Sequence, residues 1–255
     1  MKFGVGDYGM YVWDGGNFDT EERLEGLKGI GYEGIELLNA VSADDAMYKA
    51  ACFRRLGMDF AACSGPIQEA SISWTAALGK PYVRTDVGRV VNETTPPMDF
   101  DTFCRQVNYQ VNACARWGLQ VGHQNHLGQL VESQKQLETF LSRCPDCGLL
   151  LDTAHLAAAD GDCLEIVRKY SDRLVAVHLN DWLLTNPDIG LDRWEKRGRF
   201  CALGAGNIGL DNAAVMRALV EAGYDGWVFV EHDTHLQDPL KDLAISRQYL
   251  RAAGF

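Results

Sequence analysis

Long basic runs, long apolar runs and a second cysteine pair are all missing from this sequence of 255 residues. Lys and Arg number 24 against 35 Asp and Glu, and the formal net charge is −11. A nucleic acid would be repelled by this charge unless a local basic patch or a bound cation intervened. No apolar run is long enough to cross a membrane, and no secretion signal opens the sequence. We therefore expect a cytoplasmic protein with neither nucleic acid nor membrane as its partner.

The eight cysteines are scattered along the chain rather than arranged as a disulfide framework. Cys144 and Cys147 have the spacing of a redox or zinc pair. No second pair completes a zinc site, and this one follows a helix-like stretch instead of opening a helix. We interpret it as a turn before the next strand, and we expect reduced thiols.

Short apolar runs alternate with longer amphipathic stretches, and the alternation repeats eight times. Several runs are continuous in Val, Ile and Leu, as a parallel strand covered on both faces requires. The predicted strands are Phe3–Gly6, Gly34–Leu37, Asp59–Cys63, Tyr82–Thr85, Leu119–Gly122, Gly148–Leu151, Leu174–Leu179 and Trp227–Val230.

Helical stretches between these runs begin after capping residues and end near glycines. Asp19 and Ser42 are the expected N-caps of the first two. No linker-like segment or change in composition divides the chain, so the sequence predicts one domain, residues 1–255, with the α/β fold of a single (β/α)₈ TIM barrel. The helices that we name are Thr20–Gly29, Ala43–Leu56, Phe100–Trp117 and Asp211–Ala222.

One connection, Asp181–Leu210, is too long for a plain loop, and it is rich in basic and aromatic residues. Long loops inside compact domains usually carry function. We expect this loop to cover the active site.

Polar side chains stand where three predicted strands end. The sixth strand runs into Asp152, the seventh carries His178, and the eighth delivers Glu231. In a barrel these positions converge above one end. A lone acidic residue at a strand end is commonly a helix cap, but carboxylates that share a site repel one another unless a cation neutralises them. Three in order predict one divalent ion, Mn²⁺, Co²⁺, Mg²⁺ or Zn²⁺.

The segments that carry these residues resemble the sugar isomerase/epimerase superfamily of xylose-isomerase-like TIM barrels. They are Asp152–Leu156, His178–Asp181 and Gly223–Asp233, and the segment His123–Glu132 is most similar to inosose-dehydratase-like members. The resemblance implies a TIM barrel and a metal held by Glu132, Asp152, His178 and Glu231.

Two positions depart from the family pattern. Gln124 stands where many members have a Glu on the fifth strand, so Gln124 is the alternative to Glu132 as the fourth ligand. Asn180 replaces the usual lysine, which removes a cation from the edge of the site.

Four residues are candidates for proton transfer, namely Glu132, Glu231, His126 and His155. The two histidines could instead orient a metal ligand. Candidates for substrate contact are Glu36, Arg84, Gln124 and Trp182; Arg84 and Asp86 could instead form structural ion pairs, and Trp13 and Trp182 could be core or rim aromatics.

The chemistry shared by the family is removal of a proton next to a carbonyl, or from a sugar hydroxyl, while a metal holds the developing oxyanion. We expect a metal-dependent lyase that acts on a keto-sugar, keto-glycoside or keto-cyclitol by β-elimination. The alternatives are a sugar or sugar phosphate isomerase or epimerase, which proceeds through an enediolate, and a non-catalytic barrel that binds a metabolite. A homo-oligomer or a partner subunit is compatible with the sequence.

Overall fold

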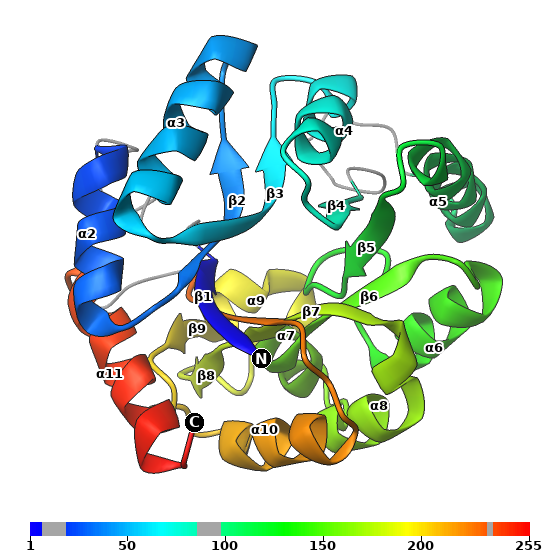
Figure 1. The fold of residues 1–255 in the computed structure, drawn as a ribbon. Coiled ribbons are helices and arrows are strands. Elements are labelled where there is room, and N and C mark those ends of the chain that lie inside the picture. Colours follow the sequence, from blue (N-terminus) through cyan, green and yellow to red (C-terminus); the bar gives the residue numbers. More distant parts are fainter. Residues whose placement is uncertain (7–18, 86–97, 234–236) are drawn as a thin grey trace.

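Eight parallel strands form a nearly closed barrel, with helices arranged around its outside (Figure 1). The computed structural model describes residues 1–6, 19–85, 98–233 and 237–255, so Trp13 and Asp86 lie outside the described residues. The hydrogen-bonded order is β3-β2-β1-β10-β7-β6-β5-β4, with β3 and β4 at its two ends. The predicted (β/α)₈ fold is therefore confirmed. The strands are β1 (Lys2–Gly6), β2 (Gly34–Asn39), β3 (Asp59–Ser64), β4 (Tyr82–Arg84), β5 (Gln120–Gln124), β6 (Gly148–Asp152), β7 (Leu174–Leu179) and β10 (Trp227–Glu231).

Every predicted apolar run is a strand of this barrel, and the ends differ by at most two residues. The largest difference is at β2 and β5, which continue two residues further toward their carboxyl ends than predicted. Polar side chains such as Asn39 and Gln124 close these strands, so an apolar pattern alone ends too early.

Helices follow the strands, and most of them begin at side-chain caps. Asp19 accepts hydrogen bonds from two backbone amides of α2, and Ser42 accepts one from α3, as predicted. The first helix ends at Ile30 and not at Gly29, and its C-cap is Gly31, which has a left-handed φ of 101°. The helices are α2 (Thr20–Ile30), α3 (Ala43–Leu56), α4 (Gln68–Ala77), α5 (Phe100–Ala115), α6 (Gln134–Arg143), α7 (Thr153–Ala158), α8 (Cys163–Tyr170), α10 (Asn212–Glu221) and α11 (Pro239–Ala252), with a 3₁₀ turn η1 (Ser171–Arg173).

The long connection after β7 is folded rather than irregular. It forms an antiparallel hairpin of β8 (Asp181–Leu184) and β9 (Gly198–Cys201), with η2 (Leu191–Arg193) and α9 (Trp194–Arg197) between the two strands. Asn207 fastens the segment that follows to the hairpin, because its side chain accepts a hydrogen bond from the Leu184 amide and donates one to the Leu184 carbonyl.

Apolar side chains fill two layers of the barrel. A large cluster lies between the sheet and the helices, and a small one that includes Tyr82, Leu150 and Phe229 fills the interior. Phe229 fits because its neighbour on β1 is Gly4, where a Cβ atom would lie 2.7 Å from the Phe229 ring. The interior is thus packed, which leaves the strand ends as the place for a site.

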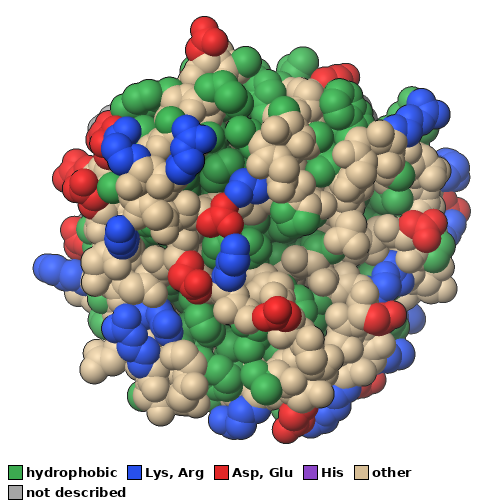
Figure 2. Space-filling view, viewed as in Figure 1, with side chains coloured by type: hydrophobic (Ala, Val, Ile, Leu, Met, Phe, Trp, Pro, Cys, Tyr) green, Lys and Arg blue, Asp and Glu red, His purple; other side chains and the backbone are tan. Residues whose placement is uncertain are grey.

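The surface in Figure 2 carries acidic and basic side chains interspersed rather than gathered in one patch of either sign. All eight cysteines are free and buried. Cys144 and Cys147 lie in the turn before β6, as predicted. Across the described parts of the chain, every helix is too short or too polar to span a membrane.

Candidate active site

Four strand ends bring Gln124, Asp152, His178 and Glu231 together in the interior. The side-chain amide nitrogen Nε2 of Gln124 lies 2.8 Å from Asp152 Oδ2, 3.3 Å from His178 Nδ1 and 3.4 Å from Glu231 Oε2. Each of the four side chains is at least nine-tenths buried. Parallel strands align these residues, since Asp152 is the register partner of His178 on the adjacent strand.

Backbone contacts fix the position of Asp152. The side chain of Asn125 accepts a hydrogen bond from the Asp152 amide and donates one to the Asp152 carbonyl, at 2.9 and 3.0 Å. The Asp152 carboxylate also caps α7 by accepting the amide of His155 at 3.1 Å. One carboxylate oxygen is thereby occupied, and the other faces His178 and Gln124.

His178 lies between two carboxylates. Its Nδ1 is 2.5 Å from Glu231 Oε2, and its Nε2 is 3.0 Å from Glu36 Oε2. Burial opposes a charge on the ring, but the two carboxylates outweigh this effect and raise the pKa of His178 well above its ordinary value. His178 therefore supplies a positive charge to the site when no metal ion is bound there.

Arg84 supplies a second positive charge. Its guanidinium contacts Glu36 at 3.1 Å and donates to Oε1 of Gln124. Burial would raise the pKa of Glu36, yet Arg84 and His178 lower it to about 2. The hydroxyl of Tyr82 donates to the same carboxylate at 3.1 Å. Glu36, Arg84 and Gln124 are thus brought together at the edge of the buried carboxylates, which suits polar contacts with a substrate.

Two carboxylates, an imidazole and an amide are donors of the kind that borderline and hard divalent cations accept. The possible ligand atoms of Asp152, His178 and Glu231 all face the side-chain amide nitrogen of Gln124. A cation would fit in the region between these three side chains. Among the described residues, one set of possible ligand atoms lies within 4.8 Å of one another in this region, namely those of Glu36, His178 and Glu231. The residues present therefore fit a single divalent ion, with Glu36 as an unforeseen neighbour.

Glu132 does not join the other three predicted ligands. Its carboxylate turns back on its own loop and accepts the amide of Gly128 at 2.5 Å. Neither set of closely spaced possible ligands in the described chain contains it. Of the two candidates for the fourth place, Gln124 is the one whose side chain touches Asp152, His178 and Glu231.

A second group of polar side chains lies beside the first and consists of His126, His155 and Asp233. The imidazole rings of His126 and His155 pack against each other with their centroids 3.7 Å apart and their planes tilted by 32°. Oδ2 of Asp233 lies 3.2 Å from Nε2 of His155 and 3.7 Å from Nε2 of His126. His155 Nε2 is also 3.9 Å from Asp152 Oδ2, so the two groups adjoin. Burial opposes a charge on His126, but Asp233 outweighs it and raises the pKa of His126.

The folded loop after β7 reaches this second group through Trp194 of α9. The Trp194 ring packs edge-on against His126 and His155, with centroids 5.9 and 6.0 Å apart. Trp182, a candidate for substrate contact, is instead only 1% exposed and packs against Phe200. The structure therefore places Trp182 in the core of the hairpin and Trp194 beside the histidines.

Sequence reasoning did not single out Asp233, Trp194 or Tyr82 as site residues. Asp233 follows the eighth strand by two residues, and that proximity to Glu231 is the signal that could have pointed to it. Trp194 lies in the long loop that was expected to cover the site. Tyr82 is the first residue of β4, and no sequence pattern marks it as a site residue. Its hydroxyl contacts Glu36 across the barrel interior.

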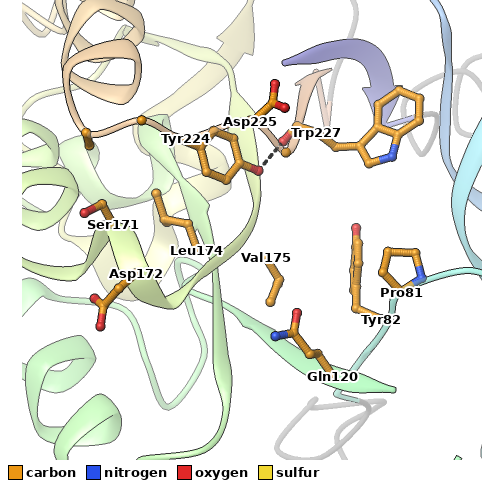
Figure 3. A pocket seen from close by; sticks show the side chains of 13 residues that line it. Pro81, Tyr82, Gln120, Ser171, Asp172, Leu174, Val175, Tyr224, Asp225 and Trp227 are labelled. Carbon is orange, nitrogen blue, oxygen red and sulfur yellow. Dashed lines mark hydrogen bonds between the residues drawn. The ribbon is translucent and has the colours of Figure 1, made fainter. Parts of the chain in front are cut away.

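A cavity of about 490 Å³ lies at the opposite end of the barrel (Figure 3). Its walls include the first residues of four strands, Tyr82, Gln120, Leu174 and Trp227. No histidine belongs to this lining, and the hydroxyl of Tyr224 donates to the Trp227 carbonyl. The polar groups described above are at the other ends of the strands, where TIM-barrel active sites lie.

Comparisons with known proteins find relatives by sequence. An inosose dehydratase from Lactiplantibacillus plantarum is 26% identical over 163 residues, which cover 60% of this chain and 54% of that protein. An inosose dehydratase from Geobacillus thermodenitrificans is 25% identical in an alignment of 290 positions, which covers 98% of this chain and 96% of that protein. The chain spans about half the length of the inosose dehydratase from Lactiplantibacillus plantarum and of a second one from Bacillus velezensis.

Solved structures share the fold at lower identity. The probable 3-DHS dehydratase involved in petrobactin synthesis from Bacillus anthracis has a TM-score of 0.72 at 13% identity, covering 98% of this chain and 99% of that one. A 3-keto-D-glucoside 4-epimerase from E. coli has a TM-score of 0.71 at 17% identity, covering 99% of both. The sequence model of the xylose isomerase-like TIM barrel family matches residues 67–253. The chain belongs to the xylose isomerase-like TIM barrel family.

Proposed function

We propose that this chain is a divalent-metal-dependent lyase that acts on a keto-cyclitol, keto-sugar or keto-glycoside. The reaction removes a proton next to the carbonyl and expels a β-substituent. The observation that carries the proposal is the pairing of two adjoining groups, since the carboxylates and His178 lie directly beside His126, His155 and Asp233. The names of the curated relatives, inosose dehydratases, support the keto-cyclitol as the first substrate to test.

Asp152, His178 and Glu231 would hold the metal, with the fourth place open to Glu132 or Gln124. A divalent ion bound there would supply a Lewis acid that lowers the pKa of the carbon acid next to the substrate carbonyl. Glu36 and Arg84 would hydrogen-bond hydroxyl groups of the substrate, because their polar atoms lie at the edge of the same site. His126 or a carboxylate, Glu231 or Glu132, would accept the proton.

Burial keeps water away from this chemistry. Asp152, His155 and His178 are fully buried, and Trp194 packs edge-on against His126 and His155. Exclusion of water strengthens electrostatic interactions inside the site and protects a reactive enolate. The hairpin β8–β9 and α9 would provide this cover.

The test is a reaction with inosose in D₂O, with Mn²⁺, Co²⁺, Mg²⁺ or Zn²⁺ added to separate samples and the metal content measured on the same protein. A lyase yields a product that has lost water. An isomerase or epimerase acting through an enediolate would instead return deuterium to carbon in a product of unchanged composition. If neither reaction occurs with inosose, keto-sugars or keto-glycosides at full metal occupancy, the proposed activity is wrong.

A further inference from the structure

The backbone of one residue, Leu127, contacts both His126 and His155. Nδ1 of His126 lies 2.7 Å from the carbonyl oxygen of Leu127. The amide N–H of the same residue, Leu127, donates to Nδ1 of His155 at 3.1 Å. Because a backbone carbonyl only accepts and a backbone amide only donates, these two contacts determine where each ring carries its proton.

His126 carries a proton on Nδ1, since this atom must donate to the Leu127 carbonyl. Its other nitrogen, Nε2, is therefore the atom that gains or loses a proton, and it faces Oδ2 of Asp233 at 3.7 Å. The contact with the carbonyl is kept in the neutral and in the charged ring. His126 can thus take up a proton and release it without breaking its backbone contact.

His155 has the opposite arrangement. Its Nδ1 accepts the Leu127 amide, so the proton of the neutral ring is on Nε2. This Nε2 is fully buried and makes no hydrogen bond of normal geometry within the described chain, although Asp233 Oδ2 is 3.2 Å away. A second proton on Nδ1 would face the N–H of Leu127, and loss of the Nε2 proton would leave an imidazolate anion. His155 can donate a hydrogen bond, but it cannot carry a proton through the reaction.

We propose that His126 alone moves protons at this site, that His155 is a fixed hydrogen-bond donor, and that Asp233 is a positioning residue for both rings. This inference rests on the proposed function. The C–H bond next to the carbonyl breaks, its electrons stay on the substrate as an enolate, and the proton goes to Nε2 of His126. The same proton then passes to the β-hydroxyl oxygen as the C–O bond breaks, water leaves, and His126 returns to its neutral state.

Glutamine is the matched substitution for this distinction. Its Oε1 can accept the Leu127 amide and its Nε2 can donate, as His155 does, but an amide does not transfer protons at neutral pH. With inosose and Mn²⁺, we expect His155→Gln to lower kcat by less than about ten-fold. We expect His126→Gln to lower kcat by about 10²–10⁴-fold, the usual contribution of a general acid or base. Equal losses in the two variants would overturn the assignment.

Asp233→Asn tests the positioning role. Asn has the same shape but cannot stabilise the charged His126 ring, so kcat should fall while KM changes little. Exchange of the proton next to the carbonyl of inosose into D₂O, followed by ¹H NMR, should slow in parallel. Wild-type kcat and exchange in Asp233→Asn would show that Asp233 has no part in proton transfer.

A substrate-free measurement separates this inference from the proposed function. In ¹⁵N NMR spectra of the metal-loaded protein near neutral pH, His155 should show the neutral tautomer with its proton on Nε2, and His126 should carry a proton on Nδ1. A proton on Nδ1 of His155 would overturn the inference. A protein that has these tautomers but no activity would count against the proposed function, while the assignment of the tautomers would stand.

Discussion

Gly6 ends β1 directly beside Glu231, and its missing side chain leaves room for that carboxylate. A Cβ atom at position 6 would lie 2.8 Å from Glu231 Oε1. Gly6→Ala should therefore displace Glu231, weaken metal binding by at least about ten-fold and reduce turnover with it. Titration calorimetry with Mn²⁺ measures the affinity. Gly29→Ala is the matched control, because a Cβ there meets nothing within 4 Å. Unchanged Mn²⁺ affinity in Gly6→Ala would mean that Glu231 is not a ligand.

His123 illustrates how neighbouring residues on one strand differ. It precedes Gln124 on β5 and so points to the opposite side of the sheet, where it packs against Phe103 and Phe140. Burial and the nearby charge of Arg84 lower its pKa to about 3. His123 is thus a core residue and not part of the site, although it opens the segment with the dehydratase-like pattern.

This burial gives a prediction for acid stability. The unfolded chain binds a proton at His123 below about pH 6.5, whereas the folded chain does so only near pH 3. Stability is therefore lost as the pH falls between these two values, by about 3 kcal/mol near pH 4. Urea unfolding of the wild type and of His123→Phe at pH 7 and pH 4 should show a smaller loss in the variant. An equal loss in both would exclude His123 as the cause.

Residue type and position predicted part of the site. Asp152, His178 and Glu231 were expected together because each ends or follows a buried apolar run on successive strands, and parallel strands align their ends. The positions of Glu132 and Asp233 depend on the path of the loops after the strands. No pattern in the sequence determines the path of a loop. The sequence therefore could not show that Asp233, rather than Glu132, lies beside His126 and His155.

At the scale of elements, the eight barrel strands could be predicted because continuous apolar runs give a strong signal. The hairpin β8–β9 could not. Its strands have four residues each and include Asp181 and Arg199, so neither has the pattern of a buried strand. Its stability comes from Trp182, Phe200 and Trp194 packing together, which is visible only in three dimensions.

The helix α9 inside this hairpin gives the next prediction. Trp194→Ala removes the ring that packs on His126 and His155, so both rings gain freedom and the site gains water. We expect kcat with inosose to fall by about ten- to a hundred-fold. Trp117→Ala, at an exposed tryptophan after α5, is the control for loss of an indole. A Trp194→Ala enzyme as active as the control would show that α9 has no role in covering the site.

At the scale of the whole molecule, three buried carboxylates, Glu36, Asp152 and Glu231, face two positive groups, Arg84 and a charged His178. These ion pairs reduce the repulsion among the carboxylates when no metal is bound. A divalent ion bound by these residues would replace the proton of His178, and it would stabilise the folded state because the unfolded chain offers no such site.

The resulting prediction links metal binding to the stability of the whole barrel. Mn²⁺ at a hundred times its Kd should stabilise the fold by about 2.7 kcal/mol. Thermal unfolding should therefore show a higher Tm with Mn²⁺ than with chelator, and elemental analysis of protein purified without chelator should approach one metal per chain. Glu231→Gln removes a ligand charge and should abolish both the shift and turnover. Glu25→Gln, at an exposed carboxylate of α2, should keep the shift. Chelator-treated protein that bound no divalent ion yet kept full activity with inosose would show that a metal has no part in the reaction. Arg84 and His178 would then be the positive groups that offset the charge of the carboxylates.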